Sequence, residues 1–238
     1  MTAAYGAVIL AAAALPCLAF LLAVDRFDRF KKEPRRLILK LFALGMGTPL
    51  AAAAVELVSV PLCGFLPEPL VILSQAFLGI AVVEEGVKLT LMTVLVRHRR
   101  EFDEVLDGAV YGVAVAMGFA LTENIFYVFG GEAPVAVALV RGLTAVPLHA
   151  LCGGLMGLSV GRFKVTSKGS VAAAFLVAVA VHGAYDWSLM DPDIPSVMIA
   201  PILLVGYTVF IARLRSARED DFESGRAGRE RRTRPPAG

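Results

Sequence analysis

Charged residues are scarce in this chain of 238 residues: Asp, Glu, Lys and Arg make up 18%, whereas hydrophobic residues make up 57%. The mean hydropathy is +0.71. A soluble domain of this size reaches such values only if nearly every helix is buried, and the apolar runs are too long for that. Many of them approach the ~20 residues that cross a bilayer core of roughly 30 Å. The composition therefore predicts an integral membrane protein.

Cysteine is also rare. The three cysteines, Cys17, Cys63 and Cys152, lie far apart and form no CxxC pair. An odd count at such spacing argues against a disulfide framework, so we interpret them as small, membrane-facing hydrophobic residues. The sequence has no internal repeat and no nucleotide-binding motif, and we expect no nucleic-acid partner. The first apolar stretch lacks a preceding basic region and does not resemble a typical cleaved signal peptide.

Hydropathy predicts an all-α bundle of about seven membrane spans, with boundaries uncertain by a few residues. The predicted spans are Tyr5–Val24, Leu37–Cys63, Leu70–Val96, Asp107–Phe129, Pro134–Val160, Gly169–Leu189 and Val197–Leu214.

The connectors between these spans alternate in charge. The first, third and fifth are basic ("DRFDRFKKEPRR", "RHRREFDE", "GRFKVTSK"), whereas the second, fourth and sixth ("GFLPEP", "GGEA", "MDPDIP") contain no Lys or Arg. Lys and Arg concentrate in cytoplasmic loops. The alternation therefore predicts an outside N-terminus, a cytoplasmic C-terminus and an odd number of spans. We divide the chain into a membrane domain, residues 1–214, and a basic cytoplasmic tail, residues 215–238, whose polar composition is typical of disorder.

Ionisable residues inside spans are the strongest functional candidates, because each costs roughly 3 kcal/mol at a helix centre. The candidate site residues, with one neighbouring amide, are Glu84, Glu85, Lys88, Glu123, Asn124, Arg141, His149, His182 and Asp186. At 1.5 Å per residue, the acids and imidazoles of these four spans reach about the same depth in the bilayer. The sequence thus predicts one buried polar site built from four helices.

The segment "EEGVK" places Lys88 on the same helix face as both preceding glutamates, since Glu84 is four residues away and Glu85 three. Lys88 can pair with one carboxylate and leave the other free as a general base or acid. A structural role requires one carboxylate at most, so the pair indicates catalysis. His182 and Asp186 are also four residues apart and point to one side of their helix.

Other polar or small residues in the spans have simpler explanations. A structural ion pair or interfacial snorkelling accounts for Arg141 and Glu56 better than catalysis does, and Lys40 near a span end is expected to snorkel. Phe119 is adequately explained by packing. The glycines of "LCGGLMGLSVG" predict close contact between helices.

His149 and His182, with Glu123 or Asp186 as a further ligand, form a donor set suited to Zn²⁺. A bound metal would activate a coordinated water and polarise a substrate carbonyl. In a metal-free alternative, a glutamate activates water directly and the histidines stabilise the oxyanion. The residues themselves leave both chemistries open.

Four motifs follow one another on successive spans. They are "EEGVK" (an EExxK motif), "FALTEN" (FxxxEN, with Glu123 and Asn124), an isolated His149 preceded by Arg141, and "HGAYD" (HxxxD). In this order they resemble the PrsW family of intramembrane proteases, and "RFKKEP" in the first basic connector fits the same family. The resemblance extends from about Asp25 to the seventh span. The family is distantly related to the CAAX prenyl proteases and bacteriocin-processing enzymes, which have a histidine where this chain has Glu123.

The resemblance implies a multi-pass protease of the bacterial cell membrane, surrounded by lipid and cleaving membrane or membrane-proximal proteins. The best-known member makes the first cut in an anti-sigma factor. By analogy with the CAAX enzymes, Glu84 would be the base and Lys88 would order Glu85. His149 and His182 would bind metal or the oxyanion.

The analogy leaves supporting roles for the remaining candidates. Glu123 and Asp186 would be ligands or orient the imidazoles, and Asn124 would donate a hydrogen bond to the transition state. The rival interpretation is a proton- or cation-coupled transporter, which predicts an inverted repeat and broken helices. Pro147 favours that rival, but no repeat and no Gly or Pro interruption beside Glu84 supports it.

Overall fold

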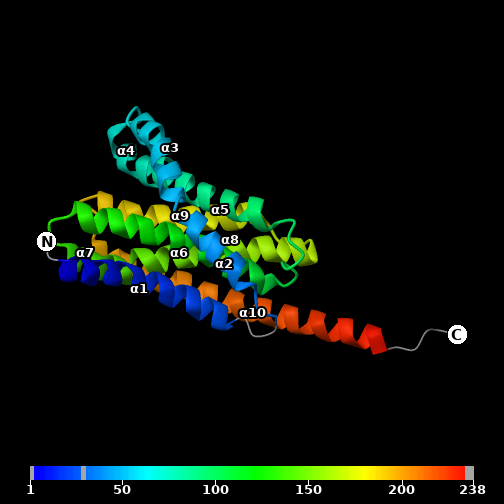
Figure 1. Ribbon diagram of the computed structural model, residues 1–238. Coiled ribbons are helices and arrows are strands. Elements are labelled where there is room, and N and C mark those ends of the chain that lie inside the picture. Colours follow the sequence, from blue (N-terminus) through cyan, green and yellow to red (C-terminus); the bar gives the residue numbers. More distant parts are fainter. Residues whose placement is uncertain (1–2, 28–30, 234–238) are drawn as a thin grey trace.

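The computed structural model describes residues 3–27 and 31–233, and all regular structure within these ranges is helical. The elements are α1 (Ala3–Phe27), α2 (Arg35–Gly45), α3 (Thr48–Cys63), α4 (Glu68–Ser74), the π-helix η1 (Gln75–Ala81), α5 (Val82–Val96), α6 (Val105–Gly130), α7 (Pro134–Leu143), α8 (Ala145–Thr166), α9 (Val171–Met190), the 3₁₀-helix η2 (Ser196–Met198) and α10 (Ile199–Thr233). They form an elongated bundle in which α1 begins and α10 ends at opposite ends (Figure 1).

Seven segments of the described chain are long and apolar enough to cross a membrane. They are Tyr5–Phe27, Arg35–Cys63, Leu70–Val96, Val105–Gly130, Pro134–Thr166, Val171–Met190 and Ser196–Glu223. Each overlaps one predicted span, so the all-helical class and the number of segments able to span a membrane are confirmed.

Two of the seven segments are interrupted by a break between two α-helices. The second breaks between α2 and α3 next to Gly47, and the fifth breaks between α7 and α8 at Thr144. A proline follows each break, Pro49 in α3 and Pro147 in α8. A proline early in a helix removes a backbone donor that has no partner there, whereas it disrupts a continuous helix. The prolines therefore mark where a new helix begins.

Helix α6 is the core of the bundle: every residue from Val105 to Ala120 is buried. Its glycines lie against the backbone of α8, since a Cβ atom built on Gly112 would lie 2.1 Å from the carbonyl oxygen of Gly153. A Cβ on Gly157 would likewise lie 2.0 Å from the carbonyl oxygen of Gly108. The two helices approach so closely only because these positions lack side chains. The predicted packing role of the α8 glycines is confirmed.

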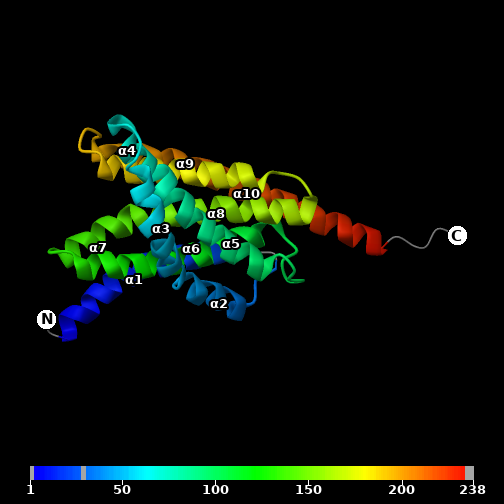
Figure 2. The same ribbon diagram turned by 90° about the horizontal axis from the view of Figure 1, so that it is seen from above.

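The basic connectors meet at one end of the bundle. Lys31, before α2, pairs with Asp103, before α6. Lys164, near the end of α8, donates a 2.6 Å hydrogen bond to the carbonyl oxygen of Arg99, after α5. In both views this is the end toward which α10 extends (Figures 1 and 2). The alternating charge of the connectors therefore corresponds to a physical separation of the two ends.

Helix α10 continues beyond residue 214 and contacts the rest of the bundle. The Asp221 carboxylate accepts hydrogen bonds from the backbone N–H groups of Val105 (2.8 Å) and Leu106 (3.0 Å) at the start of α6. Asp220 pairs with Arg162 at 2.9 Å. These contacts attach the helix as far as Asp221, and the division of the chain at residue 214 stays a prediction.

The three cysteines are free, and all are buried within the protein. The absence of a disulfide between them agrees with their spacing. Their predicted orientation toward lipid is wrong, because Cys17 and Cys152 are both 0% exposed. Cys152 instead donates a weak 3.6 Å hydrogen bond to the carbonyl oxygen of Ala178, between α8 and α9.

Candidate active site

The π-helix η1 lies directly before the glutamate pair of α5. The pair follows the π-helix η1, whose extra residue per turn changes the direction in which the next side chains point. Ser59 of α3 donates a 2.8 Å hydrogen bond to the carbonyl oxygen of Gly79 within η1. The Phe77 ring fits against Gly183 of α9, where a Cβ atom would lie 2.6 Å from it. The π-helix is thus held from two sides directly before the glutamates.

Glu84, Glu85, His149 and His182 come together from α5, α8 and α9. One ligand atom of each lies within 4.8 Å of the others, and all four residues are buried. The structure therefore brings together four of the acids and imidazoles that the sequence predicts for one site. It is called the Glu–His cluster below.

Lys88 is the cation of the Glu–His cluster. Its Nζ lies 3.1 Å from Glu84 Oε2, 2.8 Å from Glu85 Oε1 and 3.0 Å from His149 Nδ1. The sequence predicted that Lys88 pairs with one glutamate and leaves the other free. The structure instead shows contact with both, because the ammonium has three donors and both carboxylates lie within its reach.

The two nitrogens of His149 have different roles. An ammonium group can only donate, so Nδ1 accepts from Lys88 and the ring proton is on Nε2. Nε2 lies 2.7 Å from Glu123 Oε2 and donates to it. Arg141 holds that same oxygen at 2.8 Å and donates from Nε to Asn124 Oδ1, also at 2.8 Å. Glu123 therefore orients His149, and Arg141 orients Glu123.

His182 lies among three carboxylates. Its Nδ1 is 2.7 Å from Glu85 Oε1, so the ring donates from this nitrogen. Its Nε2 is 3.4 Å from Asp186 Oδ2 and 3.7 Å from Glu84 Oε2. The i,i+4 pair with Asp186 predicted from the sequence is formed. Both imidazoles thus have a carboxylate neighbour outside the Glu–His cluster. Glu123 is hydrogen-bonded to His149, whereas Asp186 Oδ2 lies 3.4 Å from His182 and has no hydrogen-bond partner among the described residues.

A search with protein-family models gives one decisive match. The model described as PrsW family intramembrane metalloprotease matches residues 33–214 of this chain, well over half of its length. The chain belongs to the PrsW family.

Curated relatives agree with this assignment. Protease PrsW of Geobacillus kaustophilus is 33% identical over 169 residues, which cover 70% of this chain and 72% of that protein. Protease PrsW of Oceanobacillus iheyensis is 28% identical over 215 residues, or 89% and 97% of the two chains. Protease PrsW of Bacillus subtilis is 36% identical over 118 residues, or 48% and 53%. No solved structure matches the chain.

Membership of the PrsW family confirms the predicted enzyme class, a membrane protease, and the predicted multi-pass location in the cell membrane. It gives no support to the transporter. The breaks at Gly47 and Thr144 and the π-helix beside the glutamates are features that a transporter also predicts. Helix interruptions therefore do not separate the two classes, whereas the family match does.

Phe119 of α6 contributes more to this PrsW site than the packing role that its sequence position suggested. The Lys88 ammonium lies 3.9 Å from the centroid of the Phe119 ring. The same ring is 5.3 Å, centroid to centroid, from His149. The aromatic face thus partly solvates the buried cation. The signal for this contact was the FxxxEN motif itself, which places Phe119 one turn before Glu123 on the same face.

Arg141, Glu56 and Lys40 were expected to have structural explanations. Arg141 forms an ion pair, as expected, but its partner is Glu123, so it belongs to the edge of the site. Glu56 of α3 does not pair with it, and its Oε1 atom is buried without a hydrogen-bond partner among the described residues. Lys40 is exposed on α2.

The residues of the Glu–His cluster fit a divalent cation in kind and in charge. Two imidazoles and two carboxylates are donors that Zn²⁺ accepts. Glu85 Oε2 is buried without a hydrogen-bond partner among the described residues. Buried polar atoms are normally hydrogen-bonded, so this free oxygen fits the role of a metal ligand. The carboxylates at the site are those of Glu84, Glu85, Glu123 and Asp186, and its permanent cations are Lys88 and Arg141. Ionised carboxylates and neutral imidazoles would leave an excess of two negative charges, which a divalent cation would neutralise.

A pocket of about 340 Å³ lies beside the site, between α6, α7, α9 and α10. Arg141 and Tyr185 line it, together with apolar residues that include Val140 and Leu189. Tyr185 is bonded to Thr144 at the break between α7 and α8, at 3.0 Å. The interrupted span therefore borders an apolar space next to the bonded group of Arg141 and Glu123.

Proposed function

We propose that this PrsW protease hydrolyses peptide bonds of membrane or membrane-proximal proteins at the Glu–His cluster. The observation that supports this proposal best is the convergence of four buried ligand atoms within 4.8 Å, from helices that are distant in sequence. Burying such groups is expensive. The cost is understandable if they activate water and stabilise charge that develops on the substrate carbonyl.

We assign the role of general base to Glu84. Glu85 is 0% exposed and is held by both Lys88 and His182, whereas Glu84 is 7% exposed and makes longer contacts. A base must reach a water molecule, so the less constrained carboxylate is the better candidate. Glu85 then fixes Lys88 and His182. This assignment agrees with the one implied by the CAAX enzymes.

A metal ion, if bound, would be held by His149 and His182 with carboxylates as further ligands, and Zn²⁺ is the ion that the donor set favours. The sequence pointed to Glu123 or Asp186 as the third ligand. The geometry of the Glu–His cluster favours Glu85 instead, because its Oε2 atom is buried without a hydrogen-bond partner among the described residues, and leaves Glu84 as the base. Glu123 and Asp186 lie beside His149 and His182, respectively. When bound, the ion would supply Lewis acidity toward water and a carbonyl oxygen.

The metal-free chemistry uses the same protein groups. Glu84 takes the proton of water, and the ammonium of Lys88 supplies positive charge near the developing oxyanion. His149, whose Nε2–H donates to Glu123, accepts from Lys88 and holds it in place. The Oδ1 atom of Asn124 accepts a hydrogen bond from Arg141, whereas its Nδ2 atom is buried without a hydrogen-bond partner among the described residues. The unpartnered N–H groups support the proposed role of Asn124 as a donor to the transition state.

We propose that the basic end of the bundle faces the cytoplasm, with the start of α1 outside and the end of α10 inside. The gathering of the basic connectors at one end supports this orientation, because Lys and Arg are retained on the cytoplasmic side. A cysteine-accessibility assay with single cysteines in the connectors at Lys168 and Gly131 tests it. Labelling of position 131 from outside and of position 168 only after permeabilisation is expected, and the reverse pattern would contradict the orientation.

The substrate is expected to be a single-pass or membrane-proximal protein that enters beside Arg141. The apolar pocket of about 340 Å³ at that position supports an apolar substrate side chain there. An anti-sigma-factor-type substrate, cleaved in a first step, is implied only by the family resemblance and stays a prediction.

Reconstitution with a single-pass substrate in lipid vesicles tests the proposed catalysis. Glu84→Gln is expected to abolish cleavage while the protein remains folded, and His182→Ala and Glu85→Gln are expected to reduce it strongly. Glu68→Gln, at the exposed start of α4, is the matched control. Cleavage that persists in all three site variants would refute the assignment of the catalytic centre.

Metal content separates the two chemistries. The zinc version predicts about one equivalent of bound zinc in the purified wild-type protein, a lower content in His149→Ala, and activity that is lost with a chelator and restored by zinc. Activity that survives exhaustive chelation, in protein without bound metal, would leave only the metal-free version.

A further inference from the structure

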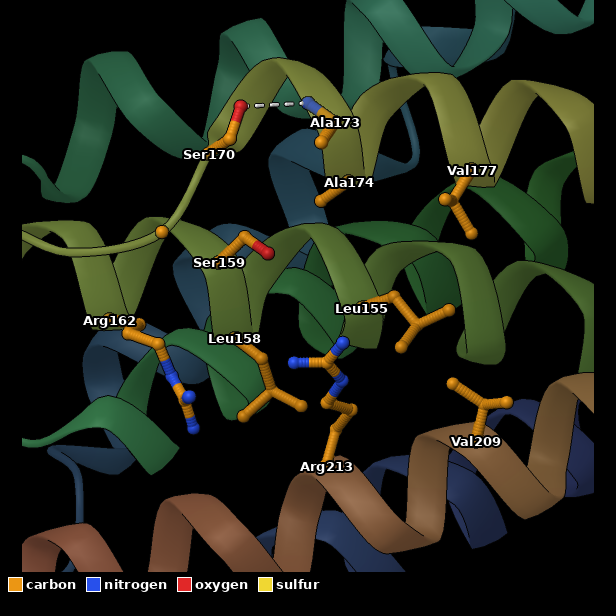
Figure 3. A pocket seen from close by; sticks show the side chains of 11 residues that line it. Leu155, Leu158, Ser159, Arg162, Ser170, Ala173, Ala174, Val177, Val209 and Arg213 are labelled. Atoms are coloured by element: carbon orange, nitrogen blue, oxygen red, sulfur yellow. Dashed lines mark hydrogen bonds between the residues drawn. The ribbon is translucent and has the colours of Figure 1, made fainter.

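A second pocket lies at the basic end of the bundle, away from the Glu–His cluster. It has a volume of about 260 Å³ and is formed by α8, α9 and α10 (Figure 3). Its polar lining consists of Ser159, Arg162, Ser170 and Arg213, and its apolar lining includes Leu155, Val177 and Val209. We name it the α8–α10 groove.

The polarity of the α8–α10 groove changes in the same direction along all three helices. On α8 the lining passes from Arg162 to Leu155, on α9 from Ser170 to Val177, and on α10 from Arg213 to Val209. Seven residues of helix correspond to about 10 Å, so α8 and α9 change from polar to apolar over the same distance. The polar positions lie nearest the connector between α8 and α9, which is at the basic end.

Arg213 supplies the unneutralised charge of the groove. Its side chain extends from α10 toward α8, between Leu155 and Leu158 (Figure 3). It has no hydrogen-bond or ion-pair partner among the residues that the structure describes. Arg162, in contrast, is bonded to Asp220 at 2.9 Å and to Ser216 at 3.4 Å. The groove thus contains one guanidinium that is ion-paired, that of Arg162, and one that has no partner among the described residues, that of Arg213.

The sides of the groove reach the membrane-facing surface. Val177 is 48% exposed and Val209 is 44% exposed, and both belong to membrane-spanning segments. A ligand with an anionic head and an apolar chain would place its head on Arg213 and its chain along these residues. Basic pockets between membrane helices suit the headgroups of anionic lipids, and arginine matches phosphate geometry.

We propose that the α8–α10 groove binds an anionic phospholipid, with its phosphate on Arg213 near Ser170 and one acyl chain between α9 and α10. Neither the protease reaction nor the assignment of its base is needed for this binding. The groove joins α10 to α8, and α8 carries His149, so the bound lipid also fastens α10 to a helix of the active site.

Native mass spectrometry of the delipidated full-length protein tests the proposal. Phosphatidylglycerol is expected to bind at least tenfold more tightly than phosphatidylcholine with the same chains. Arg213→Gln is expected to weaken phosphatidylglycerol binding about tenfold, the effect of losing one charge-assisted hydrogen bond. Arg215→Gln, on an exposed arginine two residues along α10 that does not line the groove, is the matched control and is expected to change binding less than twofold.

A steric variant and a soluble competitor complete the test. Ala173→Leu, in the lining of the groove, retains every charge and is expected to weaken lipid binding as Arg213→Gln does. Inorganic phosphate and glycerol phosphate are expected not to displace the lipid. Equal binding of the two lipids, equal effects of the Arg213 and Arg215 variants, or displacement by inorganic phosphate would each overturn the proposal. Unchanged thermal midpoints establish that the variants are folded.

Discussion

Lys88→Met is the substitution from which we expect the largest loss of stability. The Lys88 side chain is 2% exposed and contacts two carboxylates and an imidazole at 2.8–3.1 Å, with the Phe119 ring at 3.9 Å. Methionine has a similar length without the charge. The change therefore leaves the Glu84 and Glu85 carboxylates buried beside each other without their shared cation.

Removing one partner of a buried ion pair costs about 3–5 kcal/mol in soluble proteins. Polar groups of an unfolded membrane protein still find partners within the bilayer, which lowers such values. We therefore expect a loss of about 3 kcal/mol in the free energy of unfolding, or about a hundredfold in the unfolding equilibrium.

Unfolding by SDS in mixed micelles, followed by helix content, measures this difference. Lys40→Met is the matched control, since it makes the same substitution at a lysine that is exposed on α2. It is expected to change the free energy of unfolding by less than about 0.5 kcal/mol. Lys88→Arg retains the charge and is expected to lie between the two. Equal unfolding curves for Lys88→Met and Lys40→Met would refute the conclusion that this ammonium neutralises the glutamate pair.

The same variant tests the proposed cation affinity of the Glu–His cluster. The ammonium and a divalent cation are drawn to the same carboxylates, so zinc is expected to stabilise Lys88→Met more than the wild-type protein. Absence of any stabilisation by zinc in both proteins would contradict a metal site formed by these residues.

Three further substitutions test the packing and capping contacts by thermal unfolding in detergent. Gly112→Ala is expected to cost about 1–3 kcal/mol, because a Cβ atom there would lie 2.1 Å from a carbonyl oxygen of α8, whereas Gly130→Ala, with open space, is expected to be neutral. Asp221→Asn weakens two hydrogen bonds at the start of α6 and is expected to cost about 1 kcal/mol, with the exposed Glu219→Gln near zero. Phe119→Leu removes the ring beneath the buried ammonium and is expected to cost about 2 kcal/mol and to lower activity. Phe126→Leu, at an exposed position of α6, is the control for Phe119→Leu. If a control substitution lowers stability as much as the substitution it is matched to, the contact under test does not contribute as proposed.

The span count and the members of the site were accessible from the sequence because both depend on the cost of placing charge in lipid. That cost makes apolar runs long and makes each intramembrane acid or histidine conspicuous. Counting 1.5 Å per residue was then enough to place Glu84, Glu123, His149 and His182 at a common depth. Packing along α6 and α8 was also foreseeable, since glycines at close intervals have few other uses within membrane helices.

The partners within the site were not accessible in this way. Helical spacing shows that Lys88 reaches either glutamate, but contact with both, and with His149, depends on the positions of three helices. The bond between Arg141 and Glu123 depends on the break at Thr144, which changes the direction of α7 relative to α8. Spacing along one helix contains no information about the rotation of its neighbour.

Composition and periodicity alone thus determined a seven-span helical membrane protein with acids and imidazoles at one level, because local hydrophobicity fixes which segments enter the bilayer. Only the tertiary structure decided that Lys88 lies between both glutamates and His149, that Glu123 and Asp186 face the outer sides of the imidazoles, and that the cysteines point inward. These features depend on the azimuth of each helix about its axis. The azimuth is set by contacts between helices far apart in sequence, such as the glycine contacts of α6 with α8.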